Sequence, residues 1–199
     1  MDVPVPDLDT LTPAARRILE AASTLFYERG IHAVGVDTIA EAAGVTKKTL
    51  YDRFGSKESL VVAYLRLRER KWRAILSQYL DMTPNPGIDR VLSVFDAASF
   101  WYRVNGSKGC SAVNARAETV PEADGHLVFP EVTGQKAWML ETFTNLCAEA
   151  GCSDPAATGR TLMLLLEGSL VTLGMRTFAE PVEQARNAAH AILVHAIPS

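Results

Sequence analysis

The sequence has few of the features that mark secreted, membrane or metal-binding proteins. Its three cysteines are an odd number without CxxC spacing, which argues against a disulfide framework and against a zinc site. No apolar run is long and uninterrupted enough to span a bilayer, and no basic segment precedes an apolar stretch at the N-terminus. We therefore expect a cytoplasmic protein with no membrane partner and no metal or other cofactor.

Sequence patterns typical of enzymes are also missing. The chain contains no phosphate-binding loop, no nucleophile–base motif, and no metal-ligand spacing among its four histidines. We therefore expect that the protein is not an enzyme.

The small net charge of −3 conceals an uneven distribution of charge. Residues 12–75 hold twelve Lys and Arg against seven Asp and Glu, whereas the remainder of the chain is acidic. This asymmetry favours a phosphate-binding module joined to a body that repels nucleic acid.

The most informative stretch is 36–60, VDTIAEAAGVTKKTLYDRFGSKESL. Its pattern predicts two short helices joined at Gly44, with Thr46 capping the second and Leu50 and Phe54 pointing into a core. The opposite face is cationic and hydroxyl-bearing, which suits insertion into the major groove. The residues that we expect to contact DNA are Thr46, Lys47, Lys48, Thr49, Tyr51, Arg53 and Lys57.

The same residues resemble the N-terminal domain of the tetracycline-repressor (TetR) family over residues 13–60, about a quarter of the chain. The matching positions are Ile39, Ala40, Ala43, Gly44, Val45, Thr46, Thr49, Leu50, Tyr51, Phe54 and 56–60. Gly35 and Asp37 occupy places that often hold Ser or Thr and a basic residue, and Arg53 replaces a usual His or Tyr. The resemblance implies a homodimeric transcriptional regulator, most often a repressor, that is released from a pseudopalindromic operator by a small-molecule effector.

The remainder of the chain is expected to be helical, with breaks at 83–87, 106–109 and 120–130. The predicted fold is all-α, with about nine helices. Residues 12–58 would form a three-helix helix-turn-helix domain, and residues 59–199 a helical domain for effector binding and dimerisation.

The resemblance implies an effector pocket in the second domain and a dimer formed by the last two helices, 155–176 and 181–197. Within the apolar run 162–175, Glu167 either lines that pocket or makes a structural salt bridge or partner-helix contact. For dimerisation we expect Ala188, Ala189, Ile192, Leu193 and Ala196 on the last helix. We also expect a second apolar side of helix 155–176, formed by Leu162, Leu166, Ser169, Leu170 and Leu173. The expected ligand-binding residues are Phe95, Ser99, Tyr102, Cys110, Asn114, Trp138, Met163 and Glu167.

Two alternatives stay open at this point. The chain could be a helical ligand-binding or scaffold protein whose DNA head is weak or silent, which is consistent with Gly35 and Asp37. Cys110 could be a redox sensor, although a lone buried cysteine is usually inert.

Overall fold

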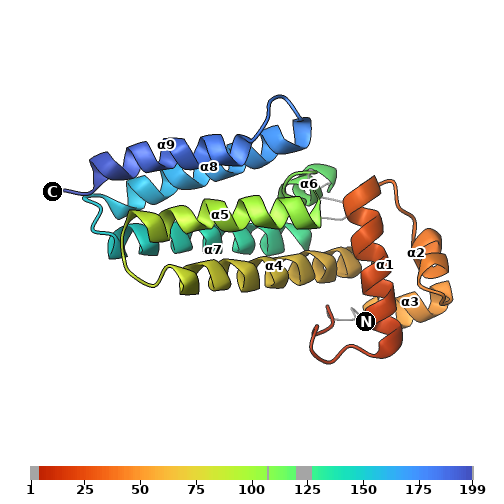
Figure 1. The fold of residues 1–199 in the computed structure, drawn as a ribbon. Helices are drawn as coiled ribbons and strands as arrows, with labels where there is room; N and C mark the ends of the chain where they lie inside the picture. Colours follow the sequence, from red (N-terminus) through yellow and green to blue (C-terminus); the bar gives the residue numbers. More distant parts are fainter. Residues whose placement is uncertain (1–4, 107, 120–126, 199) are drawn as a thin grey trace. The chain divides into compact units, whose positions relative to one another are not determined.

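The computed structural model describes residues 5–106, 108–119 and 127–198, and all regular structure within them is helical. The prediction of an all-α protein with about nine helices is confirmed for this part of the chain (Figure 1). The helices are α1 (Pro13–Arg29), α2 (Val36–Ala42), α3 (Lys47–Phe54), α4 (Lys57–Met82), α5 (Ile88–Asn105), α6 (Ser111–Glu118), α7 (Val128–Glu149), α8 (Pro155–Met175) and α9 (Pro181–Ala196). In the same residues, none of these helices is long and apolar enough to cross a membrane.

The chain folds into two compact units, each made from separate parts of the sequence. Unit 1 comprises Met1–Arg70 and Ser111–Gly134, and unit 2 comprises Lys71–Cys110 and Gln135–Ser199. Helices α4 and α7 each contribute residues to both units. The division at residue 58 was a functional prediction and stays one, because compactness alone does not assign a role.

Unit 1 is built around α1. Thr12 caps this helix, since its Oγ1 accepts a hydrogen bond from the Ala15 N–H at 3.3 Å, and Pro13 occupies the first turn, where its missing N–H costs nothing. Phe26 is buried and meets the ring of Tyr64 on α4 edge-on, with ring centroids 5.7 Å apart. This apolar core supports α2 and α3.

The core of unit 2 is formed by α5, α7, α8 and α9, together with Leu76 from the part of α4 that belongs to this unit. Phe95 and Phe143 are fully buried, with their ring centroids 5.8 Å apart. Helices α7 and α8 approach closely at Gly159, where an added Cβ would lie 3.0 Å from the backbone nitrogen of Thr144. Packing of α9 on both α5 and α8 completes the unit.

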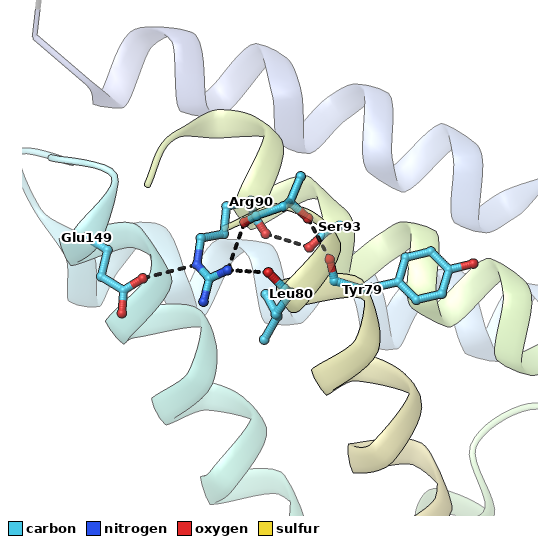
Figure 2. A network of polar contacts seen from close by, with 6 residues as sticks. Tyr79, Leu80, Arg90, Ser93 and Glu149 are labelled. Carbon is cyan, nitrogen blue, oxygen red and sulfur yellow. Dashed lines mark hydrogen bonds and ion pairs between the residues drawn. The ribbon is translucent and has the colours of Figure 1, made fainter. Parts of the chain in front are cut away.

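Arg90 connects the C-terminal end of α4 to α5 and α7 (Figure 2). Its guanidinium donates to the backbone oxygens of Leu80 and Thr83 at 2.5 and 2.8 Å, and to Glu149 Oε2 at 3.3 Å. The last carbonyls of a helix have no intrahelical donor, and a cation is favoured near them by the helix dipole. Arg90 therefore caps α4.

Two sequence predictions need correction. Val128, Phe129 and Pro130 belong to the first turn of α7, not to a loop, because proline is tolerated there; residues 120–126 of the predicted loop lie outside the described residues. On α9, Ala189 and Leu193 are buried within the chain, whereas Ala188 is exposed and Ile192 and Ala196 are half-buried. On α8, four residues of the second apolar side are core and Leu173 is half-buried; the four are Leu162, Leu166, Ser169 and Leu170. The large apolar side chains that point outward on α8 and α9 are Leu164, Val171, Met175 and Val194.

Candidate functional site

The local sequence fixes α3 as a short helix with a buried side and an exposed side. Thr46 caps it, because its Oγ1 accepts from the Thr49 N–H at 3.1 Å, and Gly44 permits the turn that precedes it with a φ of +63°. Leu50 and Phe54 are fully buried and anchor the helix to unit 1. The other side of α3 is thereby presented to solvent.

The predicted DNA-contacting residues all lie on α3, at its cap or at the first residue of α4. Most are exposed, and Thr49 and Lys57 are half-buried. The structure thus brings together one continuous set: Thr46, Lys47, Lys48, Thr49, Tyr51, Arg53 and Lys57. Their roles at DNA stay predictions.

Carboxylates hold the two lysines of α3, a feature that the sequence analysis missed. Lys47 Nζ lies 3.0 Å from Asp37 Oδ2 on α2, and Lys48 Nζ lies 2.7 Å from Asp52 Oδ2 one turn along α3. The side chains of Lys47 and Asp37 are 50% and 74% exposed, so water screens the pair and either partner is readily exchanged. The i, i+4 spacing of Lys48 and Asp52 could have indicated the second pair.

Helix α6 and the start of α7 also contribute to unit 1 through carboxylates. Glu118 at the end of α6 accepts from the His32 N–H at 2.8 Å, in the turn between α1 and α2. Glu58 accepts from the Leu127 N–H at 2.7 Å, and Glu131 Oε2 lies 2.8 Å from Arg66 Nε. These contacts link α6, Leu127 and the start of α7 to the helices that support α3.

Five of the predicted effector residues belong to the core of unit 2 or pack against it: Phe95, Tyr102, Cys110, Trp138 and Met163. Phe95 is in the core, Met163 packs at its edge, and Trp138 is covered by the guanidinium of Arg73, whose Cζ lies 3.9 Å from the ring centroid. Tyr102 is half-buried against the same core. Asn114 is an exposed residue of α6 in unit 1.

Ser99 and Phe95, both predicted ligand residues of α5, border one groove of about 330 Å³. Ser99 is exposed, and the lining residues on α9 include Val182 and Arg186. Arg186 Nε pairs with Asp96 Oδ1 at 2.7 Å in this groove. Charged side chains therefore line part of this groove.

Glu167 and Cys110 do meet, through a lysine that the sequence analysis did not identify. Lys136 Nζ lies 2.6 Å from Glu167 Oε1 and 3.1 Å from Cys110 Sγ. Burial alone would lower the pKa of Lys136, but the attraction and hydrogen bonds of Cys110 and Glu167 outweigh it and raise that pKa. Lys136 is the only Lys or Arg between Arg116 and Arg160, a sequence signal that could have found the partner of Glu167.

No group of three or more His, Cys, Asp or Glu is arranged to hold a metal ion among the residues that the structure describes. The chemistry visible in this part of the chain is that of a cationic helix face and of a lysine–carboxylate–thiol cluster.

Comparison with known proteins supports the helix-turn-helix assignment. Residues 18–64 match the family model of bacterial regulatory proteins of the tetR family. The repressor KstR2 of Rhodococcus jostii is 48% identical over 65 residues, and the activator FasR of Mycolicibacterium smegmatis is 50% identical over 50 residues. These alignments cover 32% and 25% of this chain, and 32% and 23% of the two relatives, so each spans a third of the relative or less.

The fold comparison extends over nearly the whole chain. The crystal structure of a TetR-family transcriptional regulator from Streptomyces coelicolor is 31% identical, with a TM-score of 0.85, and the match covers 94% of this chain and 97% of that one. A TetR-family regulator from Cytophaga hutchinsonii, at 14% identity and a TM-score of 0.80 over 95% of this chain and 98% of that one, shares the fold. Helix α3 is capped and anchored by buried residues, and the match to the Streptomyces coelicolor regulator covers nearly the full length of both chains. Together with the family-model match, these findings show that the chain belongs to the TetR family of bacterial transcriptional regulators.

Proposed function

We propose that the protein is a homodimeric DNA-binding regulator in which each protomer inserts α3 into the major groove of one half of a pseudopalindromic operator. The observation that carries this proposal is the face of α3, where Lys47, Lys48, Tyr51 and Arg53 are all exposed around a buried anchor. Lysines can contact guanine or phosphate, and a tyrosine ring can contact a thymine methyl. Residues 12–58 then form the DNA-binding domain, and residues 59–199 the domain for dimerisation and effector binding.

The outward apolar face of α8 and α9 supports dimerisation through these helices. Leu164, Val171 and Met175 recur on one side of α8 at helical spacing and are 73%, 48% and 65% exposed, and Val194 on α9 is 50% exposed. A row of large apolar side chains in water is typical of a surface that pairs with another protein. Replacing Leu164 and Met175 with Asp should give monomers by analytical ultracentrifugation, and a dimer that is unchanged in this variant would refute the assigned interface.

The effector is proposed to be a mostly apolar small molecule that binds in unit 2. Lys136 already pairs with Glu167, so a cationic group on the ligand is no longer required to neutralise that carboxylate. An effector changes operator affinity only by binding the two conformations of the dimer unequally, typically with 1–3 kcal/mol of coupling. Among compounds that raise the melting temperature of the protein, those that bind the two conformations unequally should therefore also change its affinity for the operator.

The decisive experiment selects binding sites from random duplex DNA and then titrates the selected duplex. Wild-type protein should give a saturable shift, and Lys48→Ala should change the preferred sequence. Lys57→Ala should weaken specific and non-specific binding alike, lowering the salt dependence (log K against log salt) by about one unit. Failure to select any sequence would favour the alternative, a ligand-binding protein whose DNA head is silent.

We further propose repression as the direction of regulation, as the name of KstR2 states for that relative. FasR, which is 50% identical over 50 residues, is named an activator, so a partial match of this kind does not set the direction. A promoter carrying the selected site should be less active when the protein is expressed, and a more active promoter would reverse the assignment.

A further inference from the structure

The cluster of Cys110, Lys136 and Glu167 places a nucleophilic amine against a thiol. Lys136 on α7 donates to Cys110 Sγ at 3.1 Å and to Glu167 Oε1 on α8 at 2.6 Å. The side chains of Lys136 and Glu167 are 25% and 22% exposed, so the cluster is mostly enclosed but reachable by small solutes. The ion pair with Lys136 is sufficient to neutralise the Glu167 carboxylate. That ion pair does not account for the second contact of the same ammonium, which is with the sulfur of Cys110.

The backbone keeps Cys110 in this position. Gly109 has a φ of +79°, and a Cβ added to it would lie 3.0 Å from the carbonyl oxygen of Leu170 on α8. Gly174 is similarly close, because its Cβ would lie 3.3 Å from the backbone oxygen of Lys108. The segment 108–110 therefore packs directly on the helix that carries Glu167, and the two glycines allow that approach.

We propose that Cys110 and Lys136 form a reversible covalent sulfenamide link when the protein meets a two-electron oxidant of the peroxide class. In the first step the thiol of Cys110 takes one oxygen atom from hydrogen peroxide, giving a sulfenic acid and one water molecule. In the second step the amine nitrogen of Lys136 attacks the sulfur, so that the S–N bond forms, the S–O bond breaks and a second water molecule leaves. The thiol loses two electrons in total, and the O–O bond of the peroxide accepts them.

Glu167 supplies the proton transfer that the second step requires. Only a neutral amine attacks sulfur, whereas Cys110 and Glu167 favour the ammonium form of Lys136 by raising its pKa. Glu167 Oε1, 2.6 Å from Nζ, is placed to accept the proton that the ammonium must lose. Sulfenic acids condense with nitrogen to give sulfenamides that thiols reverse, so a neighbouring amine protects the sulfur from further oxidation.

The other two cysteines are placed differently. Cys147 and Cys152 are buried, and burial together with the neighbouring Cys152 raises the pKa of Cys147 to about 12. The thiolate is the reactive form, so Cys147 is expected to react slowly.

The proposal does not depend on the proposed regulatory function, since it concerns the chemistry of the folded chain alone.

The experiment treats the full-length protein with hydrogen peroxide, blocks the remaining thiols and maps the proteolytic peptides by mass spectrometry. The expected product joins the Cys110 peptide to the Lys136 peptide, lighter by two hydrogen atoms than their sum, and dithiothreitol restores both. Glu167→Gln should slow formation of this link by on the order of 100-fold.

Lys136→Arg is the matched control, because it keeps the cation beside Glu167 but replaces the amine by a weakly nucleophilic guanidinium. Circular dichroism verifies that this variant and Cys110→Ser are folded. The linked peptide should be absent from both variants, and Lys136→Arg should instead accumulate sulfenic and sulfinic acid at Cys110. The proposal is overturned if wild-type Cys110 oxidises without a link to Lys136, or if Cys110 ends in a disulfide.

Discussion

At the scale of single residues, the two lysines of α3 are the clearest example of chemistry that sequence alone shows incompletely. Their number and position were predicted, but the carboxylates that hold them, Asp37 and Asp52, were not. In the free protein each lysine already has a partner, so contact with DNA requires these exposed pairs to open or to be shared.

Asp37→Asn is therefore expected to tighten DNA binding. The substitution releases Lys47 from a carboxylate 3.0 Å away and removes a negative charge at the start of α2. Affinity for the selected duplex should rise about two- to five-fold, the range of an exposed ion pair, as measured by fluorescence anisotropy at constant salt. Asp37→Glu keeps the charge and should show no such gain; weaker binding by the Asn variant would mean that Asp37 orients Lys47 productively.

Residues with a local cause were the most predictable. Thr46 was identified as a cap and Leu50 and Phe54 as anchors, because capping and i, i+4 burial depend on neighbours in the chain. The partnership of Lys136 with Glu167 joins positions 31 residues apart, and only the packing of α7 on α8 brings them together.

At the scale of elements, the stability of α3 depends on its cap. Thr46→Ala removes the acceptor for the Thr49 N–H and should destabilise the helix by about 1 kcal/mol. The expected result is faster amide hydrogen exchange at the start of α3 and weaker DNA binding. Thr46→Ser restores a hydroxyl acceptor and should retain most of the protection; equal exchange in all three proteins would show that packing alone holds α3.

Helix boundaries were predictable where Gly or Pro marks both ends, as in α5 between Gly87 and Gly106. The faces of α8 and α9 were not, because α8 is apolar almost all round and periodicity cannot assign such a helix to core or surface. The aromatic residues predicted to line the pocket show the same ambiguity, because a residue such as Phe95 fits a core and a cavity equally well.

At the scale of the whole molecule, the buried thiol of Cys147 makes the free energy of unfolding depend on pH in the alkaline range. Below about pH 9 the thiol is protonated in the folded and unfolded chains alike. Between pH 9 and 12 only the unfolded chain loses the proton, because burial and Cys152 raise the pKa of the folded thiol to about 12. The free energy of unfolding should therefore fall with rising pH, by up to about 1.4 kcal/mol per unit from this group.

Cys147→Ala should remove this part of the slope, measured by urea unfolding between pH 9 and 10.5, an interval within the stated window. Leu146→Ala, a neighbouring buried residue of α7, is the control: it should lower stability at every pH and leave the slope as it is. An unchanged slope in Cys147→Ala would show that other groups control the alkaline transition.

The outward apolar face of α8 and α9 has a consequence for the amount of protein. If pairing of Leu164, Val171 and Met175 with a second copy supplies part of the stability of each chain, folding obeys mass action. The melting temperature would then rise with protein concentration, and scarce copies would spend more time dissociated, with an apolar surface open to proteases and to aggregation. The cellular abundance of the protein would in that case set the lifetime of each copy as well as the occupancy of its DNA sites.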